Sequence, residues 1–335
     1  MNLGIEIGRC GVVAATILLS GVVAFAAEPQ VQFVDVGDSV KLEVLDWGGT
    51  GRPIILLAGS GNTAHIYEGF APKLTDCGHV YGITRRGYGA SSKPERGYSV
   101  PELSEDVWRV IQSLKLSKPV VIGHSMAGSE LSFLGQKHSA QLGALIYLDA
   151  NADPMDFPWS NAEFRALTMK SMKGAVGPPK PTDTDKASIE AYRNYQKRIG
   201  MPPFPANEIR NIYDINPDGS VGKNRTPPFV SHEIDDGSIR KDYTGINIPV
   251  LALIAVPPSP SEQSKEQPPK DQQERADSAR LNEILLEYIQ RWETNLKRAD
   301  PRARIVELPG AHHYLFLNEE ADVLREIRAF LQTLN

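Results

Sequence analysis

Short runs of apolar residues recur along the chain and alternate with amphipathic stretches. The runs lie at 53–58, 80–84, 119–122, 144–148, 249–254 and 304–308. Runs that stay apolar at every position are typical of strands buried on both faces of a parallel sheet. The stretches with helical spacing lie at 101–116, 129–138, 271–299 and 318–334. This alternation predicts an α/β fold, with a mostly parallel sheet and helices on both of its faces.

Two segments before the first buried run have a different pattern. Apolar and polar residues alternate over 31–34 and 40–45, and Gly37 and Asp38 lie between them. Alternation on both sides of a turn signal predicts an antiparallel hairpin at the start of the sheet.

The connection from about 151 to 246 is far longer than those between the other predicted strands. Helical spacing at 162–173 and 187–199 and proline-rich turn signals such as 216–219 fall within it. We expect it to form a cap over the carboxyl edge of the sheet. The core would then comprise 27–150 and 247–335, with an irregular loop at 257–269.

The first residues have the layout of a secretory signal peptide. Arg9 precedes an apolar run over 10–25, and Ala24 and Ala26 form an A-x-A cleavage site. The alternative is a membrane anchor, but the run is short for a span of about 20 residues. We therefore expect removal of residues 1–26 and export to the periplasm or the outside, with no stable membrane association afterwards. Cys77 would remain as a single cysteine, which excludes an internal disulfide.

Charge limits the classes of partner. The formal net charge is −5 and 23% of the residues are charged. Without a basic excess the sequence does not predict nucleic-acid binding. The composition predicts no particular oligomeric state.

Ser125 is the strongest candidate for a catalytic residue. It lies in the stretch Gly123-His124-Ser125-Met126-Ala127, directly after a predicted buried strand and before a predicted helix. A sharp strand-to-helix turn lifts a serine hydroxyl above the sheet and requires small flanking residues. Ala127 stands at the fifth position, where this turn usually has glycine, and Gly128 follows it.

The strand order, this turn and the arginine–glycine loop at 84–92 together resemble the α/β-hydrolase superfamily over about residues 31–334. The loop is similar to that of esterases, epoxide hydrolases and haloalkane dehalogenases. The last two use an aspartate where this chain has Ser125, which argues against both activities.

The resemblance implies a histidine base after the last strand, where His312 and His313 are adjacent. A histidine suits the role because its pKa lies near neutrality. Aligning the superfamily's glycine–histidine pair with these two residues places His313 on the catalytic histidine, so we favour His313 over His312. The superfamily's acid usually follows the seventh strand, but no carboxylate lies there before Glu262. We therefore prefer Asp149, after the sixth strand, over Asp153 and Glu262.

An oxyanion hole needs two preorganised backbone donors. The amide of Met126 would be one of them. The resemblance implies that the amide of Ser60, in the loop after the third strand, is the other. His65 and Tyr67 follow on this loop, either lining the pocket or at the surface. His79, His138 and His232 are isolated in the sequence, so we predict no metal. The serine-hydrolase interpretation requires no cofactor.

The sequence thus predicts a serine hydrolase that cleaves carboxylic esters of small substrates through Ser125, His313 and Asp149. Amide or lactone hydrolysis, aminopeptidase action and a cofactor-free lyase reaction are alternatives that use the same residues. A non-catalytic binding protein is a third interpretation, because a fold alone does not imply a function.

Overall fold

A computed structural model describes residues 28–153, 155–156, 158–171, 179–258 and 271–334. The expected signal peptide, Glu262 and most of the 257–269 loop lie outside these residues. Within the described ranges, every helix is too short or too polar to cross a membrane.

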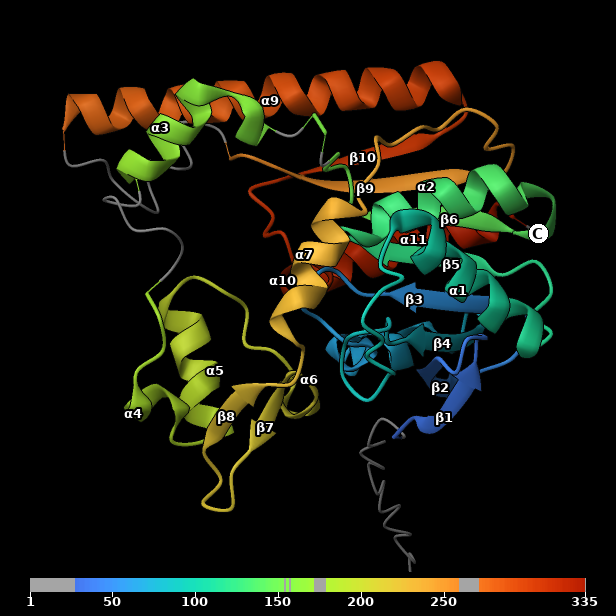
Figure 1. Ribbon diagram of the computed structural model, residues 1–335. Helices are drawn as coiled ribbons and strands as arrows, with labels where there is room; N and C mark the ends of the chain where they lie inside the picture. Colours follow the sequence, from blue (N-terminus) through green and yellow to red (C-terminus); the bar gives the residue numbers. More distant parts are fainter. Residues whose placement is uncertain (1–27, 154, 157, 172–178, 259–270, 335) are drawn as a thin grey trace, which may run out of the picture.

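The described residues form an eight-stranded sheet with the order β1-β2-β4-β3-β5-β6-β9-β10 (Figure 1). Its strands are β1 (Gln30–Asp35), β2 (Lys41–Gly48), β3 (Pro53–Leu57), β4 (His79–Ile83), β5 (Val120–His124), β6 (Ala144–Leu148), β9 (Val250–Val256) and β10 (Arg304–Pro309). β1 and β2 pair antiparallel, as do β2 and β4, whereas all later pairs are parallel. The predicted fold class, including the N-terminal hairpin, is confirmed.

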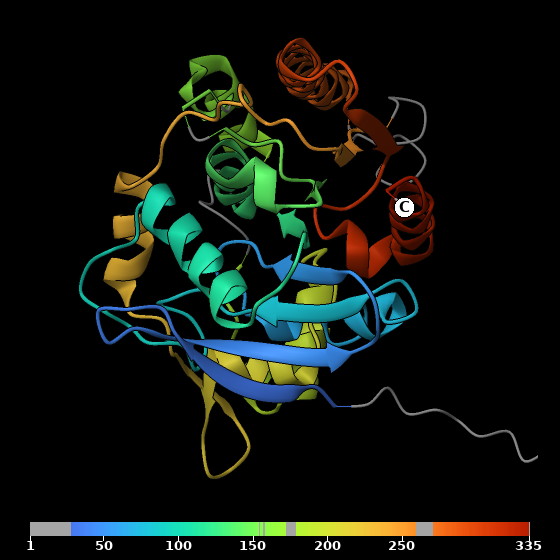
Figure 2. The same cartoon turned by 90° about the vertical axis from the view of Figure 1, so that its right-hand side faces the viewer.

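Helices cover both faces of the sheet because its central strands are apolar on both (Figure 2). In β3, Ile55 and Leu57 belong to one hydrophobic cluster, and Ile54 and Leu56 to another. The helices that bury residues in the first cluster are α1 (Val100–Ser113), α2 (Ala127–His138) and α9 (Gln272–Ala299). The elements that bury residues in the second include η1 (Ala64–Tyr67), η2 (Ala71–Leu74), α10 (Leu315–Asn318) and α11 (Glu320–Gln332).

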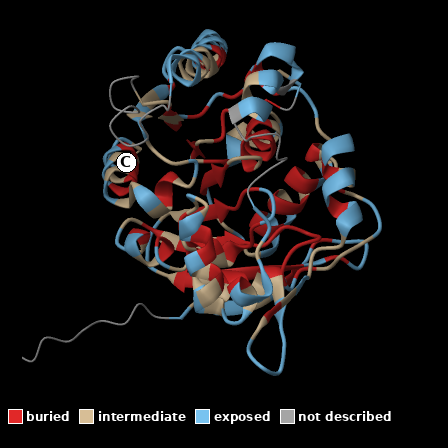
Figure 3. Cartoon of the chain, turned by 90° about the vertical axis from the view of Figure 1, so that its left-hand side faces the viewer, coloured by how far each residue is buried: buried red, intermediate tan, exposed pale blue. Residues whose placement is uncertain are grey.

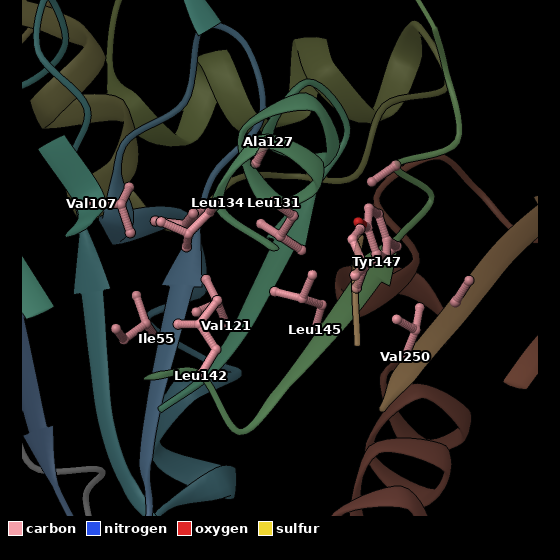
Figure 4. Close-up of a cluster of buried hydrophobic side chains, with 14 of the residues drawn as sticks. Ile55, Val107, Val121, Ala127, Leu131, Leu134, Leu142, Leu145, Tyr147 and Val250 are labelled. Carbon is pink, nitrogen blue, oxygen red and sulfur yellow. The ribbon is translucent and has the colours of Figure 1, made fainter. Parts of the chain in front are cut away.

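Packing between α2 and the sheet fixes the helix that follows Ser125. Figure 4 shows Leu131 and Leu134 of α2 beside Val121 of β5 and Leu145 of β6, and all four are buried. Burying a leucine or valine side chain stabilises a fold by roughly 1.5–3 kcal/mol. The buried residues concentrate in the sheet and the inner faces of its helices (Figure 3).

The inserted segment, 151–246, divides into parts with different contacts. α3 (Ala162–Ser171) lies beside α9, where Arg280 pairs with Glu163 through two hydrogen bonds of 2.9 Å (Figure 1). Next comes a small unit formed by α4 (Asp183–Lys186), α5 (Ile189–Arg198), α6 (Ala206–Ile212), β7 (Tyr213–Ile215) and β8 (Val221–Asn224). α7 (Pro228–Asp236) then packs against Tyr98 and Leu103 at the start of α1.

Two details of secondary structure differ from the expectations. The stretch expected to be one helix over 318–334 is divided between α10, which begins earlier, and α11. β7 and β8 form an antiparallel hairpin around the turn signal at 216–219. This hairpin was not predicted, because its strands have three and four residues and show no clear alternation.

Candidate active site

Ser125 occupies a sharp turn between β5 and α2. Its φ is 55°, in the left-handed region that side chains other than glycine rarely adopt. The space around the turn is small, since a Cβ at Gly123 would lie 2.5 Å from Leu131 Cδ1. The strand, the turn and the helix therefore hold the Ser125 hydroxyl at the carboxyl edge of the sheet.

Ala127 and Gly128, the two residues at the start of α2, have different surroundings. Ala127 is fully buried, and its methyl group fits within the packing of the turn. A Cβ at Gly128, in contrast, would lie 2.3 Å from the carbonyl oxygen of Ala150. The close approach that demands a glycine thus falls one position later, where α2 meets the chain leaving β6.

The structure brings Ser125, His313 and Asp149 together from three distant parts of the chain. His313 Nε2 lies 3.0 Å from Ser125 Oγ, and His313 Nδ1 lies 2.6 Å from Asp149 Oδ2. The other carboxylate oxygen of Asp149 accepts a hydrogen bond of 3.0 Å from the amide of Ala255. An imidazole held in this way is placed to take a proton from the serine hydroxyl.

The alternative residues have other partners. Asp153 accepts hydrogen bonds from the amides of Met155 and Lys241. The ring of His312 accepts one from the amide of Tyr314. Of the candidates inside the described ranges, Asp149 is the carboxylate that contacts His313.

The loop after β3 lies directly against the serine. A Cβ at Gly59 would lie 3.0 Å from Ser125 Cβ and 2.8 Å from His124 Nδ1, so this loop approaches as closely as only glycine allows. The amide of Asn62 donates a hydrogen bond of 3.3 Å to the carbonyl of Gly59, which closes a turn around Ser60. The segment that carries one predicted donor, the amide of Ser60, therefore lies next to Ser125, and Met126 follows the serine directly in the chain.

Buried polar side chains hold the segments around the serine in place. Arg85 donates to Glu130 of α2 at 2.6 Å and to the carbonyl of Ala58 at 2.9 Å. The ring of His124 lies 2.9 Å from the carbonyl oxygen of His313 through Nε2. Burial lowers the pKa of His124 well below its usual value, so the ring is neutral and donates this hydrogen bond.

A pocket of about 700 Å³ opens beside the serine and the histidine. Apart from Ser125, Asp149 and His313, its lining is Met126, Ser129, Asn151, Ala152, Ala255, Val256, Pro257, Pro258, Leu285, Tyr288, Ile289 and Ala311. Among these described residues, none of the others carries a charge. The pocket therefore suits an uncharged, mainly apolar group.

Two buried charged groups near the site were not predicted. Lys241 donates a hydrogen bond of 2.6 Å to the carbonyl of Ala150, and burial lowers its pKa to about 7. Glu208 of α6 is fully buried against the loop after β3. Both lie in the inserted segment without a recognisable motif, so sequence patterns gave no signal for them.

The other side chains considered for the site lie away from it. Tyr67 is fully buried and donates to the carbonyl of Leu57, and the ring of His65 lies 3.3 Å from Glu43. Neither of them lines the pocket. In the parts of the chain that the structure covers, no three His, Cys, Asp or Glu side chains are grouped to hold a metal ion.

Comparison with known families gives a match over the first part of the core. Residues 52–178 match the family described as alpha/beta hydrolase fold. The chain is 33% identical over 122 residues to the AB hydrolase superfamily protein YisY of Bacillus subtilis, which covers 36% of this chain and 45% of that protein. It is 29% identical over 232 residues to epoxide hydrolase A of Mycobacterium tuberculosis, or 65% of this chain and 72% of that protein. The chain thus spans about half the length of YisY.

Solved structures share the whole architecture at low sequence identity. The crystal structure of E-2-(acetamidomethylene)succinate hydrolase superimposes with a TM-score of 0.64 and 19% identity, over 91% of this chain and 99% of the other. A marine microorganism esterase gives a TM-score of 0.60 and 19% identity, over 87% and 100%. These likenesses extend the shared fold beyond the region of sequence similarity.

Proposed function

We propose that this chain, whose residues 52–178 match the alpha/beta hydrolase fold family, is a serine hydrolase that cleaves carboxylic esters of small substrates. The observation that carries this proposal is the chain of contacts from Ser125 Oγ through His313 to Asp149, beside a pocket. Epoxide hydrolase A supports the wider class of hydrolase. The serine at the turn favours acyl transfer over the epoxide chemistry named for that relative.

In the proposed reaction the Ser125 oxygen attacks the ester carbonyl carbon while His313 Nε2 takes the hydroxyl proton. Asp149 holds the imidazole and stabilises its cationic form. The amides of Ser60 and Met126 donate to the oxyanion. His313 then protonates the departing alkoxide, which leaves an acyl group on Ser125. A water molecule, activated by His313, hydrolyses this acyl-enzyme and restores the serine.

The test combines a covalent probe with a substrate panel. We expect a fluorophosphonate to label the protein once, on the peptide that contains Ser125, as identified by mass spectrometry. We also expect p-nitrophenyl esters to be hydrolysed faster than matched anilides, lactones and aminoacyl substrates. Labelling at another residue, or tight ligand binding without any labelling, would contradict the proposal.

The pocket lining predicts a preference for an uncharged acyl group. p-Nitrophenyl butyrate and mono-p-nitrophenyl succinate have acyl chains of equal carbon number, but the second carries a carboxylate. Burying an ionised carboxylate without a positively charged partner costs more than the roughly 1–3 kcal/mol of an unpaired neutral polar group. We therefore expect kcat/KM to be at least about 10- to 100-fold higher for the butyrate. Equal values for the two esters would show that the acyl group binds elsewhere.

We also propose that residues 1–26 direct export and are then removed. The support is the charged start, apolar run and A-x-A site of the sequence, a segment outside the described residues. The mass of the protein recovered from the periplasm or the medium tests this. A mass that includes residues 1–26 would contradict it.

A further inference from the structure

Glu208 is a carboxylate of the inserted segment that has no contact with the pocket and is nevertheless completely buried. Its Oε1 accepts hydrogen bonds from the side-chain amide of Asn62 at 2.9 Å and from the backbone amide of Thr63 at 3.0 Å. Its Oε2 accepts a hydrogen bond of 2.5 Å from the hydroxyl of Thr63. One carboxylate from α6 therefore binds three donors at the end of the loop that follows β3.

These donors belong to the turn that places Ser60. The backbone amide of Asn62, whose side-chain amide donates to Glu208, closes the turn by donating to the carbonyl of Gly59, with Ser60 between them. Thr63 caps η1 by accepting from the amide of His65. A carboxylate that fixes Asn62 and Thr63 thus fixes one end of a turn whose other end lies against Ser125.

The same residue is linked to the loop that carries the histidine. Asn62 Oδ1 accepts a hydrogen bond of 2.9 Å from the hydroxyl of Tyr314, the neighbour of His313. The Tyr314 ring also contacts Phe204, which lies four residues before Glu208. The inserted segment, the turn around Ser60 and the segment after β10 therefore meet in one network of hydrogen bonds and ring contacts.

We infer that Glu208 is a positioning residue that holds the turn around Ser60, and through Asn62 and Tyr314 the His313 loop, in the geometry needed for turnover. This inference rests on the hydrolase function proposed above. Glu208 does not touch the reacting atoms. It acts by reducing the movement of the groups that do, because preorganised donors are effective only when they are held near the productive position.

The ionised form of Glu208 matches its surroundings. All three partners are donors, and hydrogen bonds to a charged acceptor are stronger than those between neutral groups. Burial nevertheless raises the pKa of Glu208 to about 7, against the lowering effect of the donors and of His65. The titratable groups Tyr67 and Tyr314 also face it. Burial raises the pKa of each tyrosine above its ordinary value, so both remain neutral in this range.

This titration has opposite effects on stability and on the turn. A folded-state pKa above the ordinary carboxyl value means that neutral Glu208 contributes stability, which is full below about pH 4.5 and is lost as pH rises through about 7. The hydrogen bonds to Asn62 and Thr63, in contrast, strengthen as the group ionises. Above pH 7 the turn is held more firmly in a less stable protein.

The experiment compares Glu208→Gln and Glu208→Ala with the wild type on p-nitrophenyl butyrate. Glutamine keeps one acceptor oxygen of similar placement, whereas alanine removes all three hydrogen bonds. At pH 8 we expect kcat to fall by about tenfold for glutamine and further for alanine, with little change in KM. This is less than the 10²- to 10³-fold effect typical of losing an oxyanion donor itself.

The pH profile separates positioning from a general loss of structure. Because glutamine resembles the neutral acid, the ratio of wild-type to Glu208→Gln kcat should fall towards unity between pH 8 and pH 6. His313 is present in both proteins, so the ratio reports the effect of the side chain at position 208. Hydrogen exchange gives a readout without substrate, since the peptide over 59–63 should exchange faster in Glu208→Gln at pH 8.

Glu190→Gln is the matched control, because Glu190 is an exposed carboxylate of the same inserted segment. It should keep the wild-type kcat, pH profile and exchange rates. If the wild type reacts with the fluorophosphonate but Glu208→Ala keeps its kcat and exchange, the positioning role is wrong. If the wild type is not labelled by the fluorophosphonate and does not hydrolyse esters, the hydrolase proposal is wrong. Hydrogen exchange tests the positioning role independently of activity, because unchanged exchange at 59–63 in Glu208→Gln would contradict it.

Discussion

Ser125→Ala is expected to lower kcat for p-nitrophenyl butyrate by about 10⁴- to 10⁶-fold. The substitution removes the oxygen that would form the acyl-enzyme, while His313 and the oxyanion donors stay in place. A residual rate above that of water should remain, because binding and oxyanion stabilisation do not depend on the nucleophile. Steady-state kinetics of purified protein, with loss of fluorophosphonate labelling, measure the effect.

Ser132→Ala provides the control for this substitution. Ser132 also lies on the α2 side of the site, but its hydroxyl donates to the carbonyl of Gly128 and lies 3.1 Å from the hydroxyl of Tyr147. We expect this variant to lose some stability and to keep most of its turnover. Full turnover of Ser125→Ala would show that another group attacks the substrate.

Asp149→Asn is expected to lower kcat by about 10⁴-fold. The new side-chain amide would keep an oxygen for the amide of Ala255 and turn its NH₂ group towards His313 Nδ1. That ring nitrogen would then become an acceptor, and the proton would move to Nε2. An imidazole protonated at Nε2 donates to the serine hydroxyl and does not take its proton.

Asp153→Asn makes the same chemical change four residues further on. Its carboxylate accepts from backbone amides and has no contact with His313, so we expect kcat to change little. Urea unfolding of both variants shows whether a fall in kcat is accompanied by a fall in the free energy of unfolding. A large loss of kcat in Asp153→Asn alone would assign the acid to Asp153 instead of Asp149.

Local patterns were sufficient to predict the fold class. Continuous apolar runs marked the central strands, because strands buried on both faces need apolar residues at every position. The turn at Ser125 was predicted from its place between a strand and a helix. Because no carboxylate lies between β9 and Glu262 in the sequence, the resemblance favours Asp149 as the acid, and the structure places Asp149 beside His313.

Contacts between distant segments could not be predicted in this way. Glu208 lies 146 residues from Asn62, and nothing in its local sequence distinguishes it from an exposed helical glutamate. Lys241 likewise resembles a surface lysine until the fold buries it against Ala150. Such pairings depend on how the inserted segment packs, which a single sequence with weak local periodicity does not determine.

The backbone at the ends of β5 and β6 has a consequence for how this sequence can change. Ser125 and Asp149 both have positive φ values, 55° and 42°, although neither is glycine. Strained residues of this kind cost about 1–3 kcal/mol each, and the surrounding core must offset that cost. Glycine would relax either position and remove its side chain. Under the proposed function, a mutation to glycine at either position would stabilise the chain but remove a reacting group, so the rest of the core must supply the stability that these two backbone conformations cost.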